Sequence, residues 1–143
     1  MTTSSASKRT KSQKIKKENT EKQWMFFYTL FQASDKVSML SGEELKGPFT
    51  SMWFHHIYPK SKFPELRFCP ENIIIVTADE HNQIESGITF KELEIRKEYI
   101  SENYEELVTS TKEYIEDYLN PVYEHAKKNT VFFSNRNNQI NKK

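Results

Sequence analysis

The chain has 143 residues, of which 36% are hydrophobic and 13% are aromatic, and its formal net charge is +1. This length leaves room for one domain with tails, and the small net charge excludes a nucleic-acid binder that works by bulk charge alone. The single cysteine, Cys69, excludes an intramolecular disulfide, and the apolar runs are too short for a membrane-spanning helix. We therefore expect a cytoplasmic protein with an aromatic core.

The first 20 residues are polar and basic and lack apolar periodicity, which predicts a disordered tail over residues 1–20. Such a tail either attracts nucleic acid without regard to sequence or simply keeps the chain in solution. The main domain is expected to span residues 21–120. It begins with Trp24, Phe27 and further aromatics at helical spacing, which predict an amphipathic helix ending near residue 34.

The middle of the chain predicts two strands and a short helix. Residues 49–57 (FTSMWFHHI) are typical of a strand, and the following segment carries three prolines in 15 residues, as expected of an irregular loop. Residues 72–77 (NIIIVT) predict a buried strand. Thr77 or Asp79 is placed to cap a helix that ends at Gly87.

The rest of the chain predicts two helices over residues 89–119, separated near Asn103, where Asn103 and Glu106 match a capping box. Pro121 lies beyond the second helix, and residues 121–143 are expected to form a flexible C-terminal extension. These helices are acidic and would repel a polyanion. We expect them to face away from such a ligand, where they offer a surface for a homodimer or a protein partner.

Four side chains around the strand at 72–77 suggest a metal site. His55 and His56 are neighbours on the preceding strand, so their side chains point to opposite faces. His81 and Glu85 are four residues apart on the expected helix and share one face. One histidine of the pair, with His81 and Glu85, makes a three-ligand site with open positions. The other histidine would lie near the ion without binding it, where a neutral imidazole can take a proton from water.

The same residues resemble a known family. The stretch HHIYPKSKFPE…ENIIIVTADEHNQIESG is similar to the His-Asn-His (HNH) endonucleases, and most of all to the form in colicin-type nuclease domains. The resemblance covers roughly residues 38–87. It implies an α+β fold with a small ββα-metal (His-Me finger) core, flanked here by an N-terminal helix and two C-terminal helices, and it implies that residues 21–120 are an HNH nuclease domain.

The resemblance also implies roles for these residues. His55 and His81 would bind the metal, and His56 would be the general base that activates the attacking water. Asn72 would brace the loop by hydrogen bonds and so hold His56 in position, although an Asn at this place also suits a plain turn cap. Glu85 stands where the colicin-type pattern has a second ligand histidine, which is a departure from that pattern.

The Glu85 carboxylate favours Mg²⁺ or Mn²⁺, while the two imidazoles are also compatible with Zn²⁺ or Ni²⁺. Asn82 is the second choice for this ligand, because in other branches of the family an Asn near this place binds the metal. Many relatives also carry a Cys-x-x-Cys knuckle upstream, but residues 38–42 (SMLSG) offer only serines. Serines do not replace thiolates on zinc, so no structural zinc is expected.

The function that these features predict is metal-dependent endonuclease activity on DNA, which leaves a 5′ phosphate and a 3′ hydroxyl. Two alternatives stay open: a ribonuclease with the same site, and an inactive nucleic-acid-binding or interaction module on the same fold. Lys60, Lys62 and Arg67 follow the histidine pair and are candidates for phosphate contacts, or else belong to an ordinary solvated loop. Small proteins of this family occur in bacteria, phages and mobile elements, so a bacterial or phage-infected cell is the expected setting.

Overall fold

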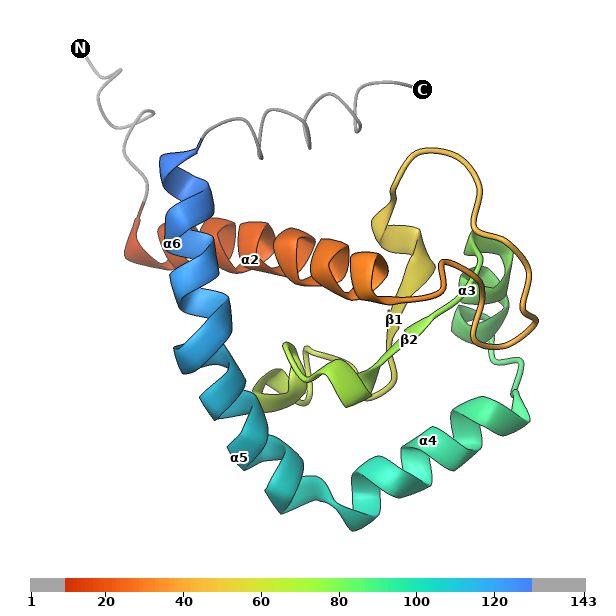
Figure 1. The fold of residues 1–143 in the computed structure, drawn as a ribbon. Helices are drawn as coiled ribbons and strands as arrows, with labels where there is room; N and C mark the ends of the chain where they lie inside the picture. Colours follow the sequence, from red (N-terminus) through yellow and green to blue (C-terminus); the bar gives the residue numbers. More distant parts are fainter. Residues whose placement is uncertain (1–9, 130–143) are drawn as a thin grey trace.

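The structure, a computed structural model, describes residues 10–129. Helix α2 (Lys11–Ala33) is followed by the strands β1 (Phe54–His56) and β2 (Ile73–Ile75), and then by α3 (Ala78–Glu85), α4 (Lys91–Glu102), α5 (Tyr104–Tyr114) and α6 (Asn120–Lys128). Short 3-10 turns cover Ser51–Trp53, Pro64–Leu66 and Pro70–Asn72. This mixture of helices with one two-stranded sheet agrees with the predicted α+β class. In Figure 1, α2 runs beside the strands, and α5 and α6 form one long rod that crosses the start of α2.

The two strands pair antiparallel, and their register decides where each histidine points. His55 pairs with Ile74, and His56 pairs with Ile73. The observed β1 is shorter than the strand predicted over residues 49–57, because Thr50 accepts a hydrogen bond from the backbone of Met52 and starts a 3-10 turn there. Each strand of the sheet is therefore only three residues long. The two faces of the sheet carry different side chains.

Each face of this sheet packs on its own core. Ile73 and Ile75 join the aromatic side chains of α2 and the buried residues of α6 in one cluster. Ile74 and Val76 join Leu93 of α4, among others, in a second cluster. Since side chains alternate along a strand, His56 lies on the α2 face and His55 lies on the opposite face. The opposite orientations predicted for the two histidines are thus observed.

Helix α2 begins ten residues earlier than the sequence predicted. The prediction of a disordered tail over residues 1–20 is wrong for residues 11–20, which are helical, while residues 1–9 lie outside the described part of the chain. At 23 residues, α2 is the longest helix described. Within residues 10–129, no helix combines the length and the apolar character needed to cross a membrane.

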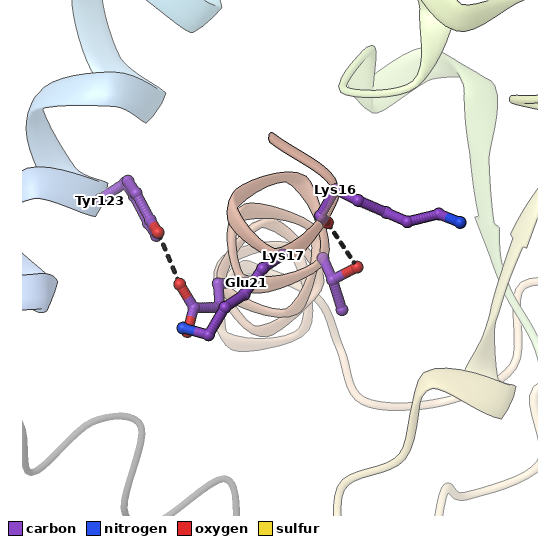
Figure 2. Close-up of polar contacts among 5 residues, drawn as sticks. Lys16, Lys17, Glu21 and Tyr123 are labelled. Atoms are coloured by element: carbon purple, nitrogen blue, oxygen red, sulfur yellow. Dashed lines mark hydrogen bonds and ion pairs between the residues drawn. The ribbon is translucent and has the colours of Figure 1, made fainter. Parts of the chain in front are cut away.

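Three contacts stabilise the polar first half of α2. Thr10 and Gln13 form a capping box, in which each side chain accepts a hydrogen bond from the other residue's backbone N–H. Lys17 Nζ lies 2.8 Å from Glu21 Oε2, one turn along the helix. Tyr123 of α6 donates its O–H to Glu21 Oε1 at 2.6 Å (Figure 2). None of these contacts leaves an apolar repeat in the sequence, which is why the pattern did not predict a helix here.

The C-terminal helix continues through Pro121 instead of ending before it. A π-helical turn, Ile115–Leu119, joins α5 to α6, and the Asn120 N–H donates to a carbonyl five residues back. A proline ring clashes with the carbonyl one turn earlier in a regular helix, and the wider π turn relieves that clash. Pro121 therefore sits at the start of α6 within a continuous rod.

The predicted flexible extension over residues 121–143 is wrong for residues 121–128. These residues form α6, and its Tyr123 and Ala126 are buried against the cluster that contains the α2 aromatics. Residues 130–143 lie outside the described part. The chain between 121 and 128 therefore belongs to the folded domain.

The break between α4 and α5 occurs at Asn103, as predicted, but by a different contact. Asn103 does not form the predicted capping box with Glu106, since its side chain makes no capping hydrogen bond to α5. Instead, Asn103 Nδ2 donates to the carbonyl of Tyr99 at 2.8 Å. The side chain thus closes the end of α4 rather than the start of α5.

Candidate metal centre and its basic flank

His55 of β1 meets His81 and Glu85 of α3 on one face of the sheet. His55 Nδ1 lies 3.3 Å from Glu85 Oε2, and His81 Nε2 lies 4.0 Å from the same oxygen. The two imidazole rings are perpendicular, with centroids 5.5 Å apart. One ligand atom from each residue falls within 4.8 Å of the others, and among residues 10–129 no second group of three His, Cys, Asp or Glu side chains does so.

This set of donors fits a single divalent cation. Nitrogen and oxygen ligands bind such an ion at about 2.0–2.2 Å, so neighbouring ligands of one ion stand about 3 to 3.5 Å apart. The His55–Glu85 separation is already in this range, the His81–Glu85 separation needs about half an ångström of adjustment, and the widest pair of ligand atoms, within 4.8 Å, needs about one ångström. The Glu85 side chain is 60% exposed and can rotate to make it. Asn82 is exposed and lies about 100° further around the helix than His81, so Glu85 is the better placed third ligand.

The two candidate ligand histidines, His55 and His81, differ in what holds them. Burial first, and then the nearby His81, lower the pKa of His55, although Glu85 acts in the opposite direction. A lowered pKa keeps the His55 imidazole neutral at neutral pH, which is the form in which histidine binds a metal. His81 Nδ1 is buried without a hydrogen-bond partner in the described part of the chain. Metal-bound histidines usually donate this second N–H to an acceptor, so here packing against His55 orients the ring instead.

A polar contact from the upstream loop fixes the start of α3. Thr77 and Glu80 form a capping box, and Ser38 Oγ donates to Glu80 Oε1 at 2.5 Å. Burial tends to raise the pKa of Glu80, but hydrogen bonds from Ser38, Ser41 and Thr77 outweigh it and hold this pKa below its usual value. Ser38 lies in the upstream loop, so this hydrogen bond to a charged carboxylate links the loop to the helix that carries His81.

His56 lies on the other face of β1, in different surroundings. Its Nε2 is 3.0 Å from the carbonyl oxygen of Arg67, and its ring lies 5.8 Å from that of Phe27 on α2. Burial first, and then the positive charges of Lys60 and Arg67, lower the pKa of His56 to about 4, against the opposite effect of the Arg67 carbonyl. The ring is therefore neutral at pH 7. Because a carbonyl can only accept, Nε2 carries the proton and Nδ1 keeps the lone pair.

Asn72 braces the loop between the strands, as predicted. Its Oδ1 accepts from the Tyr58 N–H at 2.8 Å, and its Nδ2 donates to the carbonyls of Tyr58 and Leu66 at 3.0 and 3.2 Å. Asn72 is fully buried, and its own carbonyl accepts from the Ile57 N–H. These bonds exceed what a plain turn cap needs, and they fix the chain on both sides of the loop that supplies the carbonyl to His56.

Two of the three predicted basic residues converge on a residue that the sequence did not single out. Lys60 Nζ and Arg67 Nε lie 3.3 and 2.9 Å from Gln23 Oε1 on α2. Lys62 is exposed, so the description as an ordinary solvated loop suits it better. Gln23 is separated from its partners by 37 and 44 residues. No local spacing links residues so distant, so only the fold identifies Gln23.

A scan against protein-family models and searches among curated proteins and solved structures found no match for this chain. The resemblance to the His-Asn-His endonucleases therefore depends on the motif residues, and the function must be argued from the geometry of the site.

Proposed function

We propose that this chain is a metal-dependent endonuclease that hydrolyses phosphodiester bonds in DNA. One observation carries the proposal: His55, His81 and Glu85 converge within 4.8 Å, while the next residue of β1 is a neutral histidine beside two cations. Three ligands with open positions suit a catalytic ion, and a neutral imidazole beside cations suits a base that works near a phosphate.

The arrangement of the elements supports a ββα-metal core. Two antiparallel strands, linked by a long braced loop, lead directly into the helix that carries two of the three candidate ligands. The order of the residues along the chain is the one that the resemblance requires: His55 and His56 on the first strand, Asn72 before the second, and His81 and Glu85 on the helix. The sheet thus serves to place β1 against α3.

In the proposed reaction, His55, His81 and Glu85 hold one divalent cation, which when bound supplies Lewis-acid stabilisation of negative charge on the phosphate. Nδ1 of His56 takes a proton from a water molecule, whose oxygen forms the new bond to phosphorus. The bond from phosphorus to the 3′ oxygen breaks in line with this attack, and solvent protonates the 3′ oxygen. Asn72 keeps the loop in place, so the Arg67 carbonyl holds the His56 ring in the tautomer that accepts the proton.

The donor set favours Mg²⁺ or Mn²⁺ through the carboxylate of Glu85, and the two imidazoles leave Zn²⁺ and Ni²⁺ as alternatives. A cytoplasmic setting in a bacterial or phage-infected cell stays a prediction from the sequence, as does a homodimer or protein partner at the acidic helices α4 and α5.

A second candidate function is nucleic-acid binding without cleavage. It is favoured by the pKa of His56, which at about 4 lies well below neutral pH and makes His56 a weak base. A ribonuclease with the same site is the other alternative, because neither the metal ligands nor the base depends on the sugar.

A cleavage assay separates these functions. Supercoiled plasmid is incubated with the protein and Mn²⁺ or Mg²⁺, with EDTA and the variant His56→Ala as controls, and a labelled RNA is tested in parallel. The proposal predicts metal-dependent nicking of the plasmid, which both controls abolish. Cleavage of RNA alone would identify a ribonuclease, and binding without cleavage of either substrate would identify the inactive module.

A further inference from the structure

Lys60, Arg67 and Gln23 form a cation cluster beside His56. The two basic side chains approach one amide oxygen, Gln23 Oε1, from the loop that follows β1. Neither basic group has an acidic partner among residues 10–129, where the ion pairs involve other side chains. The segments 1–9 and 130–143 contain no Asp or Glu. Two cations thus share a neutral acceptor.

The positive charges of Lys60 and Arg67 are not balanced by a nearby negative charge in the described part of the chain. Burial lowers the pKa of both Lys60 and Arg67, and Arg67 lowers that of Lys60 further by repulsion. Like charges close together, partly withdrawn from water, destabilise the free protein unless an anion joins them. An oxygen-rich anion of charge −1 or more is the ligand that relieves this repulsion, and each phosphate of a nucleic-acid backbone is such an anion.

The cluster lies next to the candidate base. The carbonyl that accepts from His56 belongs to Arg67 itself, at 3.0 Å. A phosphate bound between Lys60 and Arg67 would therefore belong to the strand that passes His56.

One stripe of α2 continues from the cluster toward the start of the helix. Phe27, Gln23, Thr20 and Lys16 are spaced by four, three and four residues, so they follow one another along a single helix face. Phe27 contacts His56 and Gln23 contacts the two cations, so this face is turned toward the site. Figure 2 shows the Lys16 side chain extending from α2 on the side away from Tyr123. Lys16 is exposed and lies about 10 Å along the axis from Gln23.

On the other face of α2, Lys17 offers a comparison with Lys16. Lys17 pairs with Glu21 at 2.8 Å, and Glu21 in turn accepts from Tyr123 of α6. The charge of Lys17 is therefore balanced within the protein, on the face that packs toward α6 (Figure 2). Lys16 and Lys17 are adjacent and chemically identical, and they differ in that Lys17 is paired with a carboxylate of the same helix.

We propose that Gln23, Lys60 and Arg67 form a phosphate-binding subsite next to His56, and that the Lys16 stripe of α2 extends it into a track for the backbone of double-stranded DNA. At about 3.4 Å of rise per phosphate of one strand, the 10 Å between Gln23 and Lys16 covers about three backbone steps. The inference deepens the proposed function, because it gives the nuclease site its substrate-binding surface.

The decisive variant is Gln23→Glu, which changes one side chain without changing its size. A carboxylate at this place satisfies Lys60 and Arg67 from within the protein. We expect Gln23→Glu to raise the melting temperature and at the same time to weaken DNA binding. A merely structural role of the cluster would not move these two quantities in opposite directions.

The test measures binding separately from cleavage. Fluorescence anisotropy of a labelled 20-bp duplex is recorded with the full chain in EDTA, between 50 and 200 mM KCl. Lys60→Gln/Arg67→Gln should weaken binding about tenfold or more at low salt and reduce the slope of log K against log salt by about 2. Lys16→Gln should reduce the slope by about 1, and the matched control Lys17→Gln should leave it unchanged.

Each outcome bears on one claim. If the wild-type chain does not bind the duplex, or if Gln23→Glu binds as tightly as wild type, the subsite is wrong, even if the plasmid is still nicked in Mn²⁺. If Lys16→Gln and Lys17→Gln have equal effects, the track along α2 is wrong. If the binding pattern holds but no metal supports nicking, the DNA-binding surface stands and the nuclease proposal fails. A preference for an RNA duplex in the same titration would overturn DNA as the ligand.

Discussion

The two faces of β1 place adjacent histidines in opposite chemical settings. On one face, His55 lies near an imidazole and the exposed carboxylate of Glu85. On the other face, His56 lies against Phe27, a carbonyl and two basic side chains. The alternation of side chains along a strand places the two histidines on opposite faces. In the proposed nuclease, the first setting would suit a cation and the second a negatively charged substrate.

The largest effect on cleavage should come from the carboxylate face, which we define as the face of β1 where His55 meets His81 and Glu85. His81→Ala removes one of three ligands, so we expect Mn²⁺ binding to be lost in calorimetry and plasmid nicking to fall to the level of the EDTA control. DNA binding measured in EDTA should be unchanged, because the cation cluster lies on the other face of β1. If His81→Ala nicks DNA at the wild-type rate, the ligand assignment is wrong.

On the opposite face, His56→Ala should slow cleavage by about 10²- to 10⁴-fold, the usual contribution of a general base. Its affinity for Mn²⁺ should match that of the wild-type chain, since the His55 side chain stays in place. Single-turnover rates together with calorimetry test this pair of results. Loss of Mn²⁺ affinity in His56→Ala would show that the two faces are not separate.

Asn72→Ala tests the hydrogen bonds that hold the loop between β1 and β2. The substitution removes three side-chain hydrogen bonds and leaves buried backbone groups of Tyr58 and Leu66 without partners, so the free energy of unfolding should drop by about 3 kcal/mol. Urea denaturation measures this change. A loss well below about 1 kcal/mol would mean that the loop is held by other contacts.

The burial of His56 also predicts how stability depends on pH. The pKa of His56 is about 4 in the folded chain and 6.5 as the ordinary value, so below pH 6.5 the unfolded chain binds a proton that the folded chain does not. This contribution to the free energy of unfolding is complete above pH 6.5, and about 3 kcal/mol of it is lost as the pH falls toward 4. Unfolding in EDTA at several pH values measures it, and His56→Gln should flatten the curve. An equal slope in both proteins would contradict the assignment.

The smallest effect concerns the choice of metal. Glu85→His places an imidazole where the proposed site has a carboxylate, so we expect the preference for Zn²⁺ or Ni²⁺ over Mg²⁺ to increase about tenfold. Competition titrations measure the ratio, with Asn82→Ala as the control that should not change it. A shift in Asn82→Ala but not in Glu85→His would make Asn82 the third ligand.

The local pattern of the sequence predicted the carboxylate face well. A strand with a histidine pair and a helix with His81 and Glu85 at helical spacing are short-range features, and the register of β1 with β2 places them together. Asn72 was predictable for the same reason, since its hydrogen bonds stay within the loop that it closes.

The opposite face of β1, where Lys60 and Arg67 lie near His56, was predictable only in part. Lys60 and Arg67 follow the histidine pair in sequence, but Gln23 joins them through the packing of α2, which no local spacing reveals. The early start of α2 was missed because ion pairs and a capping box, rather than apolar residues, stabilise its first turns. At the other end, Pro121 predicts the end of a helix, and the π turn that accommodates this proline has no recognisable pattern in the sequence.

The central claim is that one divalent cation binds between β1 and α3, and a crystal of the full chain soaked in Mn²⁺ tests it most directly. The account predicts a single strong anomalous peak at about 2.0–2.3 Å from ligand atoms of His55, His81 and Glu85. An anomalous peak on other residues, or no peak at a Mn²⁺ concentration that supports nicking, would contradict it.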